Sequence, residues 1–163
     1  MNIVLLEPEI AANTGNIGRS CLATGSVLHL IKPLGFRTDD RHIKRAGMDY
    51  WDELDVQYYD DFEDFVKQNN HPTIYMATTK AQHLYTAPYE PNPFIMFGKE
   101  SKGIPEEILV NYQATTIRIP MKAGTRSLNL ANSVAIVAYE VARQNDFAQM
   151  TLSGDLHRLT WND

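Results

Sequence analysis

Short apolar runs alternate with helical patterns along the whole chain, and this order constrains the fold more than any other feature. No internal repeat or linker interrupts the alternation. Continuous apolar runs of four to six residues bounded by turn residues are typical of buried strands. Strands are predicted at 2–6, 27–31, 54–59, 73–78, 94–97 and 115–119. Strands that alternate with helices indicate an α/β domain with a mainly parallel sheet flanked by helices.

Length and composition set the broad class. The 163 residues are enough for one domain with a sizeable core, and an apolar fraction of 44% is that of a globular protein. We expect a single domain over 1–145 and a peripheral tail over 146–163. No apolar run has the length of a membrane span, and the N-terminus lacks a charged leader with a cleavage site, so we expect a cytoplasmic protein without a membrane partner. The single cysteine, Cys21, excludes an internal disulfide.

Charge is distributed unevenly. The net charge of −5 argues against binding nucleic acid by bulk electrostatics, although a local basic patch stays open. Eight carboxylates and no Lys or Arg lie between Asp49 and Asp64. We interpret this stretch as a solvated outer face with a short strand and an amphipathic helix whose Phe62, Phe65 and Val66 point inward. His29 lies inside a predicted strand and is interpreted as a core residue, not a catalyst.

The segment from Ile117 to Gln144 combines a strand, a loop and a long helix. Pro120 ends the strand, and the helix is expected to begin at Ser127 or Asn129. Apolar side chains cover most of the circumference of this helix, which indicates cover on two sides. The polar side chains fall on one stripe: Asn129, Asn132, Ser133, Glu140, Arg143 and Gln144. The second cover could be another subunit. The alternative is a buried helix with an ordinary cap.

Three loops follow predicted strands, where ligands bind in α/β folds. They are N-T-G-N-I-G-R at 13–19, G-K-E-S-K-G at 98–103 and the loop at 120–129. The first nearly matches a dinucleotide fingerprint, but six residues separate it from its strand, and alone it indicates a helix N-terminus. The five histidines have no metal-ligand spacing, so no metal is expected, and neither a Ser–His–Asp set nor a P-loop occurs.

Taken together, the three loops resemble the motifs of SPOUT-class methyltransferases, specifically the TrmH-like group and its small TrmL subgroup. The motifs appear as N-T-G-N-I-G-R, M-F-G-K-E-S-K-G-I-P and I-P-M-x-x-x-x-R-S-L-N-L-A-N-S-V, and the similarity runs from Ile3 to about Gln144. The segments L-L-E-P-E-I, P-L-G-F, R-A-G-M-D-Y and T-T-K resemble marks of the subgroup. The resemblance implies an α/β fold whose C-terminal part forms a deep trefoil knot, and a homodimer through the C-terminal helix.

The resemblance also implies S-adenosyl-L-methionine as cofactor, bound in the knot, with S-adenosyl-L-homocysteine as product. The implied reaction is methyl transfer to a ribose 2′-hydroxyl of tRNA, at the wobble cytidine or modified uridine of leucine tRNAs. The residues that this similarity assigns to the cofactor are Ala77, Thr78, Gly98, Glu100, Gly103, Ile119, Met121, Ser127 and Leu128.

By the same resemblance, Arg19, Ser127, Asn129 and Glu100 are the catalytic candidates. An arginine stays charged in proteins and is a poor base, so we expect Arg19 to hold the substrate phosphate and stabilise the developing oxyanion. Direct proton abstraction by Arg19 is the alternative. Ser127 and Asn129 would shape the pocket, and Glu100 would orient the neighbouring loops.

For the anticodon stem-loop of tRNA, the basic cluster in this acidic chain supplies the phosphate contacts. The predicted RNA-binding residues are Arg41, Lys44, Arg45 and Arg126. Tyr50 and Trp51 are candidates for base stacking, with core packing as the alternative. Three other functions stay open: a 2′-O-methyltransferase for another RNA such as rRNA, a catalytically silent RNA-binding knotted dimer, and a nicotinamide-dependent oxidoreductase.

Overall fold

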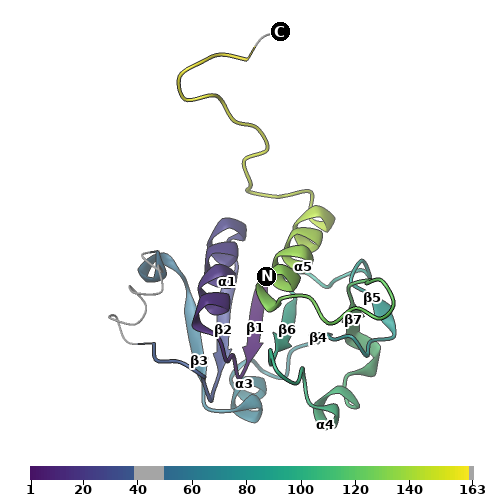
Figure 1. Cartoon of the computed structure of the whole chain (residues 1–163). Helices are drawn as coiled ribbons and strands as arrows, with labels where there is room; N and C mark the ends of the chain where they lie inside the picture. The colour runs from purple at the N-terminus through teal and green to yellow at the C-terminus, as the bar shows by residue number, and fades with distance from the viewer. Residues whose placement is uncertain (39–49, 162–163) are drawn as a thin grey trace.

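The structure, a computed structural model, describes residues 1–38 and 50–161 and is organised around one twisted sheet (Figure 1). Every strand pair in the described part is parallel, in the order β3-β2-β1-β6-β4-β7-β5. The strands are β1 Asn2–Leu6, β2 Val27–Ile31, β3 Val56–Tyr59, β4 Ile74–Ala77, β5 His83–Leu84, β6 Phe94–Gly98 and β7 Thr116–Arg118. The predicted α/β fold with a parallel sheet is confirmed.

Helices cover both faces of the sheet. The helical elements are α1 Ala11–Thr24, α3 Phe62–Gln68, α4 Glu106–Leu109 and α5 Leu130–Gln144, with 3₁₀ turns η1 Trp51–Glu53 and η2 Gln113–Thr115. Successive side chains of a strand point to opposite faces. Ile3 and Leu5 therefore pack with α1 and α5, whereas Val4 and Leu6 pack with α3 and α4. Both faces are buried, which explains why the central strands are continuously apolar.

The long helices begin and end where the local sequence requires it. α1 ends at Gly25, whose φ of 62° closes the helix in the left-handed region and lets its N–H reach Cys21 and Leu22 carbonyls, as predicted. Asn129 begins α5, because its side-chain oxygen accepts the N–H groups of Ala131 at 2.9 Å and Asn132 at 3.2 Å. The choice between Ser127 and Asn129 is therefore settled for Asn129.

Helix α5 departs from its expected polar stripe at one position. Glu140 was placed on that stripe, but its side chain is only 9% exposed. The carboxylate is neutralised by Arg143, whose Nε and Nη2 lie 2.9 and 2.8 Å from its oxygens. Ile136 and Tyr139 are exposed instead, at 37% and 47%. Within one chain, α5 is covered by the sheet and α1 on one side only.

Two outer regions follow the prediction in part. The acidic stretch forms β3 and α3 at the sheet edge, with Phe65 fully buried and Phe62 and Val66 packed against the core. Strand β5 was not predicted, because its two exposed residues carry no apolar run.

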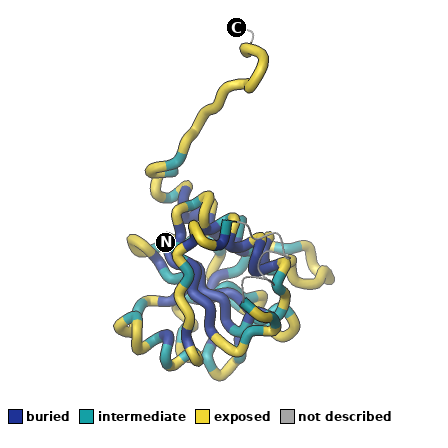
Figure 2. Tube along the Cα trace, turned by 90° about the vertical axis from the view of Figure 1, so that its left-hand side faces the viewer, coloured by how far each residue is buried: buried dark blue, intermediate teal, exposed yellow. Residues whose placement is uncertain are grey.

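Residues 151–161 are exposed, contain neither helix nor strand, and lead away from the body (Figures 1 and 2). Within the described ranges, no helix combines the length and apolar character needed to cross a membrane.

His29 is a core residue, as predicted. It is 4% exposed, and its ring nitrogens lie 2.8 Å from the Tyr59 hydroxyl and 3.2 Å from Asn2 Oδ1. Burial lowers the pKa of His29 to about 4, so the imidazole is neutral at pH 7. A neutral histidine between two polar partners satisfies its hydrogen bonds inside the core without chemistry.

Candidate active site

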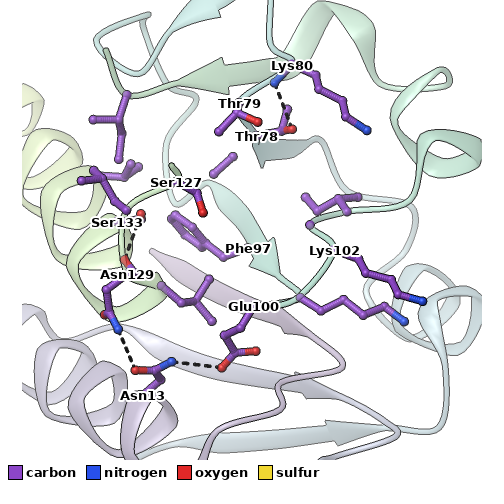
Figure 3. A pocket seen from close by; sticks show the side chains of 18 of the residues that line it. Asn13, Thr78, Thr79, Lys80, Phe97, Glu100, Lys102, Ser127, Asn129 and Ser133 are labelled. Atoms are coloured by element: carbon purple, nitrogen blue, oxygen red, sulfur yellow. Dashed lines mark hydrogen bonds between the residues drawn. The ribbon is translucent and has the colours of Figure 1, made fainter. Parts of the chain in front are cut away.

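A cavity of about 420 Å³ opens at the carboxyl ends of β4, β6 and β7, which are neighbours in the sheet (Figure 3). The loops that follow these strands form its walls, and the first turn of α1 and the first half of α5 close it. These loops come from distant parts of the chain and meet only because their strands pair. Ligands of parallel α/β sheets bind at this edge.

The walls of the cavity differ in chemical character. Part of the lining is apolar or aromatic and comes from Tyr85, Phe97, Ile117, Ile119, Leu130 and Val137. The rim carries hydroxyl and amide groups from Thr78, Thr79, Ser127, Asn129 and Ser133, and the cations Lys80, Lys99 and Lys102. An apolar wall with a few polar groups at the mouth suits a small ligand with one apolar and one charged end.

A hydrogen-bonded chain of three side chains crosses the cavity floor (Figure 3). The Asn129 amide donates to Asn13 Oδ1 at 3.0 Å, and the Asn13 amide donates to Glu100 Oε1 at 3.3 Å. Asn13 opens the N-T-G-N-I-G-R motif but was not among the predicted site residues. Its place as the first polar residue of that motif was the available signal.

Glu100 also caps α1 from a distance. Ile10, the residue at the N-cap position, has no capping side chain. The carboxylate of Glu100 instead accepts the N–H groups of Glu9 at 2.9 Å and Ile10 at 3.3 Å. An acidic group is favoured here because unpaired N–H groups and the helix dipole meet at this end. Through these hydrogen bonds Glu100 holds the loop after β6 against the start of α1.

The contact between the loops after β1 and β6 is reciprocal. Glu9 accepts the backbone N–H of Ser101 at 2.8 Å and its hydroxyl at 2.7 Å. These hydrogen bonds hold the pKa of Glu9 below its usual value. Lys99 forms an ion pair with Glu7 beside them. The position of one wall of the cavity is therefore fixed by the loop that leads into α1.

Most of the predicted cofactor residues meet at this cavity. It is lined by Ala77, Thr78, Glu100, Gly103, Ile119, Met121, Ser127 and Leu128. Gly98 lies between the lining residues Phe97 and Lys99 but is not itself part of the wall. Its φ of 115° and the Leu6 carbonyl oxygen that a Cβ would strike explain why glycine stands there.

The catalytic candidates divide into two groups. Ser127, Asn129 and Glu100 all line the cavity. Arg19 does not: it lies farther along α1, exposed, with its guanidinium carbon 5.0 Å from the centre of the Tyr50 ring. A single chain therefore does not bring Arg19 to the cavity.

The predicted RNA-contacting residues have different outcomes. Arg126 is exposed in the loop before α5. Arg41, Lys44 and Arg45 lie outside the described residues, as does the subgroup mark R-A-G-M-D-Y except for its last residue, Tyr50. Trp51 is 9% exposed and packs in the core, so it is not placed to stack on a base. Tyr50 is half-buried, and its hydroxyl donates a hydrogen bond to the Gly15 carbonyl oxygen. Among the described residues no group of three His, Cys, Asp or Glu could hold a metal ion.

Fold and cavity together define a parallel α/β protein with a small-molecule site at the carboxyl edge of its sheet. The chain belongs to the SpoU rRNA Methylase family, whose sequence profile matches residues 1–139.

Individual relatives narrow the class. A Yersinia pestis tRNA (cytidine(34)-2'-O)-methyltransferase is 45% identical over 151 residues, which cover 88% of this chain and 93% of the relative. A crystal structure from Bacillus anthracis matches with a TM-score of 0.87 and 42% identity, covering 93% of this chain and 98% of that one. A structure described as giving insights into the 2-OH methylation of C/U34 on tRNA matches with a TM-score of 0.82 and 39% identity, covering 90% and 96%.

Proposed function

We propose that this chain is an S-adenosylmethionine-dependent tRNA 2′-O-ribose methyltransferase that acts on the wobble nucleotide. The observation that carries the proposal is the cavity of about 420 Å³, which is lined by residues of all three motifs in a chain 45% identical to a tRNA (cytidine(34)-2'-O)-methyltransferase. The cavity supports this reading because its apolar wall suits a purine and its polar rim suits an amino acid group.

Positioning supplies most of the catalysis in this proposal. A bound S-adenosylmethionine would supply an electrophilic methyl group for the ribose 2′-oxygen; the new C–O bond would form as the C–S bond breaks with its electron pair kept by sulfur, and the hydroxyl proton would pass to solvent. Such a displacement requires alignment in a pocket that excludes water. Ser127 and Asn129 at the rim would hold the reacting groups, and Glu100 would hold Asn129 in place through Asn13.

Arg19 keeps its proposed role at the substrate phosphate and the developing oxyanion. Its exposed position on α1 means that substrate RNA must reach across α1, or that Arg19 serves the cavity of a second copy. We further propose a homodimer through α5. The exposed Ile136 and Tyr139 on α5 and Leu22 on α1 support it, because large apolar side chains gathered on one helical layer favour association. Sedimentation equilibrium of Tyr139→Asp should give a monomer, and an unchanged dimer would refute this interface.

The target proposed in detail is cytidine or modified uridine 34 of leucine tRNAs, contacted at the anticodon stem-loop through Arg41, Lys44, Arg45 and Arg126. The test incubates the protein with labelled S-adenosylmethionine and total tRNA, then maps the 2′-O-methylated nucleotide. Label at position 34 of leucine tRNAs is expected. Label only in rRNA would refute the tRNA target, and cofactor binding without transfer to any RNA would favour the silent RNA-binding dimer.

We propose in addition that the C-terminal part of the chain is tied in a trefoil knot. Membership of the family supports this, as does the return of the chain from β7, which pairs with β4 and β5, to α5, which packs on β6 and α1 (Figure 1). Stretching the chain by its ends in an optical trap provides the test. A knotted chain would stay shorter than the fully extended length of about 3.3–3.6 Å per residue, and full extension would refute the knot.

The proposed organisation is one methyltransferase domain over 1–145 with a tail over 146–163, in the cytoplasm, where tRNA is modified. Exposure of every described residue from 151 onwards supports the boundary. A chain that stops at residue 145 should bind S-adenosylhomocysteine as the full chain does. Loss of binding would place the tail within the domain.

A further inference from the structure

Tyr85 stands in the cavity wall at the end of the edge strand β5. Its backbone N–H donates to the Arg118 carbonyl at 3.0 Å, which ties it to β7, and its side chain is half-buried beside the core. The other residues of this part of the wall, Phe97, Ile117 and Val137, are apolar. Apolar and aromatic surroundings suit the face of a purine better than the charged end of an amino acid.

The segment that follows Tyr85 is held by a second tyrosine. The Tyr89 hydroxyl donates a hydrogen bond to the Tyr85 carbonyl oxygen at 2.5 Å. The Tyr89 ring packs edge-on against the Tyr75 ring, with 4.8 Å between the ring centroids. Burial raises the pKa of Tyr89 well above its ordinary value, which keeps the hydroxyl protonated as this donor. The Tyr75 hydroxyl in turn accepts the Glu90 N–H at 3.0 Å.

Gln144 connects this segment to the last turn of α5. Its Oε1 accepts the Tyr89 N–H at 3.2 Å, and its Nε2 donates to the Ala87 carbonyl at 3.1 Å. The same Nε2 donates to Glu140 Oε1 at 2.8 Å. Donor and acceptor are both in use, and among side chains of this length only an amide supplies both. The helix that carries Asn129 and Ser133 at the cavity therefore also fixes the segment next to Tyr85.

We propose that Tyr85 contacts the purine of the bound cofactor and that Gln144 is a positioning residue that holds Tyr85 in the wall. The inference rests on the proposed function, since it assigns an S-adenosyl ligand to the cavity. Gln144 acts through the backbone of residues 86–89, and Tyr85 acts by direct contact. Loss of either side chain weakens the cofactor's binding and leaves turnover at saturating cofactor unchanged.

The experiment is a double-mutant cycle measured by calorimetric titration with S-adenosylhomocysteine. Tyr85→Ala should weaken binding about tenfold and Gln144→Ala about fivefold. Because Gln144 acts through Tyr85, the double variant should bind no more weakly than Tyr85→Ala alone. The matched control is Gln149→Ala, which alters an exposed glutamine five residues beyond the end of α5 and should bind as the parent does.

Three further measurements separate positioning from a loss of structure. Gln144→Met keeps the side-chain length without its hydrogen bonds, so it should fold and show the same weakened binding. Titration of Tyr85→Ala with adenosine, which lacks the amino acid, should show the same fold loss as S-adenosylhomocysteine. Steady-state assays should place the change in the KM for the cofactor and leave both kcat and the KM for tRNA unchanged.

The outcomes are distinguishable. Additive losses in the double variant, or a Gln144→Met variant that binds normally, would overturn the positioning role. A Tyr85→Ala variant that binds adenosine normally would overturn the purine contact. If the parent chain itself fails to bind S-adenosylhomocysteine, the proposed function fails before the question of Tyr85 arises.

Discussion

Glu100 is the residue whose replacement tests the architecture of the site most directly. Its carboxylate accepts two backbone N–H groups at the start of α1 and the amide of Asn13, at 2.9, 3.3 and 3.3 Å. Removal of a capping side chain lowers stability by about 0.5–2 kcal/mol. A hydrogen bond to a charged group contributes about 1.5–3 kcal/mol. Since Glu100 is half-buried and two of its bonds are long, we expect Glu100→Ala to lower the free energy of unfolding by about 2 kcal/mol.

The assay is urea unfolding followed by far-UV circular dichroism at one fixed protein concentration, because association would shift the apparent stability. For a chain of this size, 2 kcal/mol corresponds to a fall in Tm of about 4–8 °C. Glu107→Ala is the matched control, because Glu107 is an exposed carboxylate on α4 without a side-chain hydrogen bond in the described structure, and it should change stability by less than about 0.5 kcal/mol.

The second readout is the cavity. Without Glu100, the Asn13 amide loses its acceptor, and Asn129 loses a fixed partner. S-adenosylhomocysteine should therefore bind more weakly to Glu100→Ala, and Glu100→Gln should lie between the variant and the parent because one oxygen remains. A Glu100→Ala protein as stable as the Glu107→Ala control would refute the capping role, and normal cofactor binding would refute the coupling through Asn13.

Three further predictions concern pH, backbone and catalysis. The pKa of His29 is about 4 in the folded protein, against an ordinary value of 6.5. Protonation of His29 therefore lowers the free energy of unfolding by up to about 3 kcal/mol as the pH falls from 6.5 to 4. In His29→Asn, urea titrations should show that this part of the pH dependence has disappeared. Gly98→Ala would combine a φ of 115° with a clash against the Leu6 carbonyl oxygen and should lower the free energy of unfolding by at least about 2 kcal/mol. Gly124→Ala, at a φ of 79° in open space, should lower it by about 1 kcal/mol. Equal losses would contradict the close approach of Gly98 to β1. Arg19→Ala should abolish methyl transfer and keep cofactor binding. If Arg19 serves a second copy, mixing this variant with inactive Asn129→Ala should restore part of the activity, whereas no recovery would favour RNA that reaches across α1 of one chain.

The framework of the fold could be predicted because its local signals agree with its tertiary environment. The central strands are buried on both faces, so they are continuous apolar runs, and Gly25 and Asn129 mark helix ends by their own chemistry. Strand β5 escaped prediction because an exposed two-residue edge strand is defined only by its pairing with β7. The burial of Glu140 escaped prediction because it depends on Arg143 and Gln144, and periodicity does not report pairing between neighbours.

The site was predictable as a set of loops but not as a set of contacts. Motif order identified most of the residues that line the cavity, since the loops follow strands that become neighbours in the sheet. The link from Asn129 through Asn13 to Glu100 joins residues up to 116 positions apart and has no local signature. The same holds for Gly98, which fits its place because of the carbonyl on β1 that it faces.

The long-range cap on α1 has a consequence for how the protein is made. The N–H of Glu9 waits for an acceptor 91 residues downstream, and at about 5–20 residues per second the ribosome delivers it roughly 5–20 s later. The last cavity wall, on α5, leaves the ribosome later still. During that interval α1 has neither its cap nor its helical neighbour, and no cofactor can stabilise the nascent chain. The growing polypeptide is therefore most exposed to proteases and in greatest need of chaperones until its final helix has been synthesised.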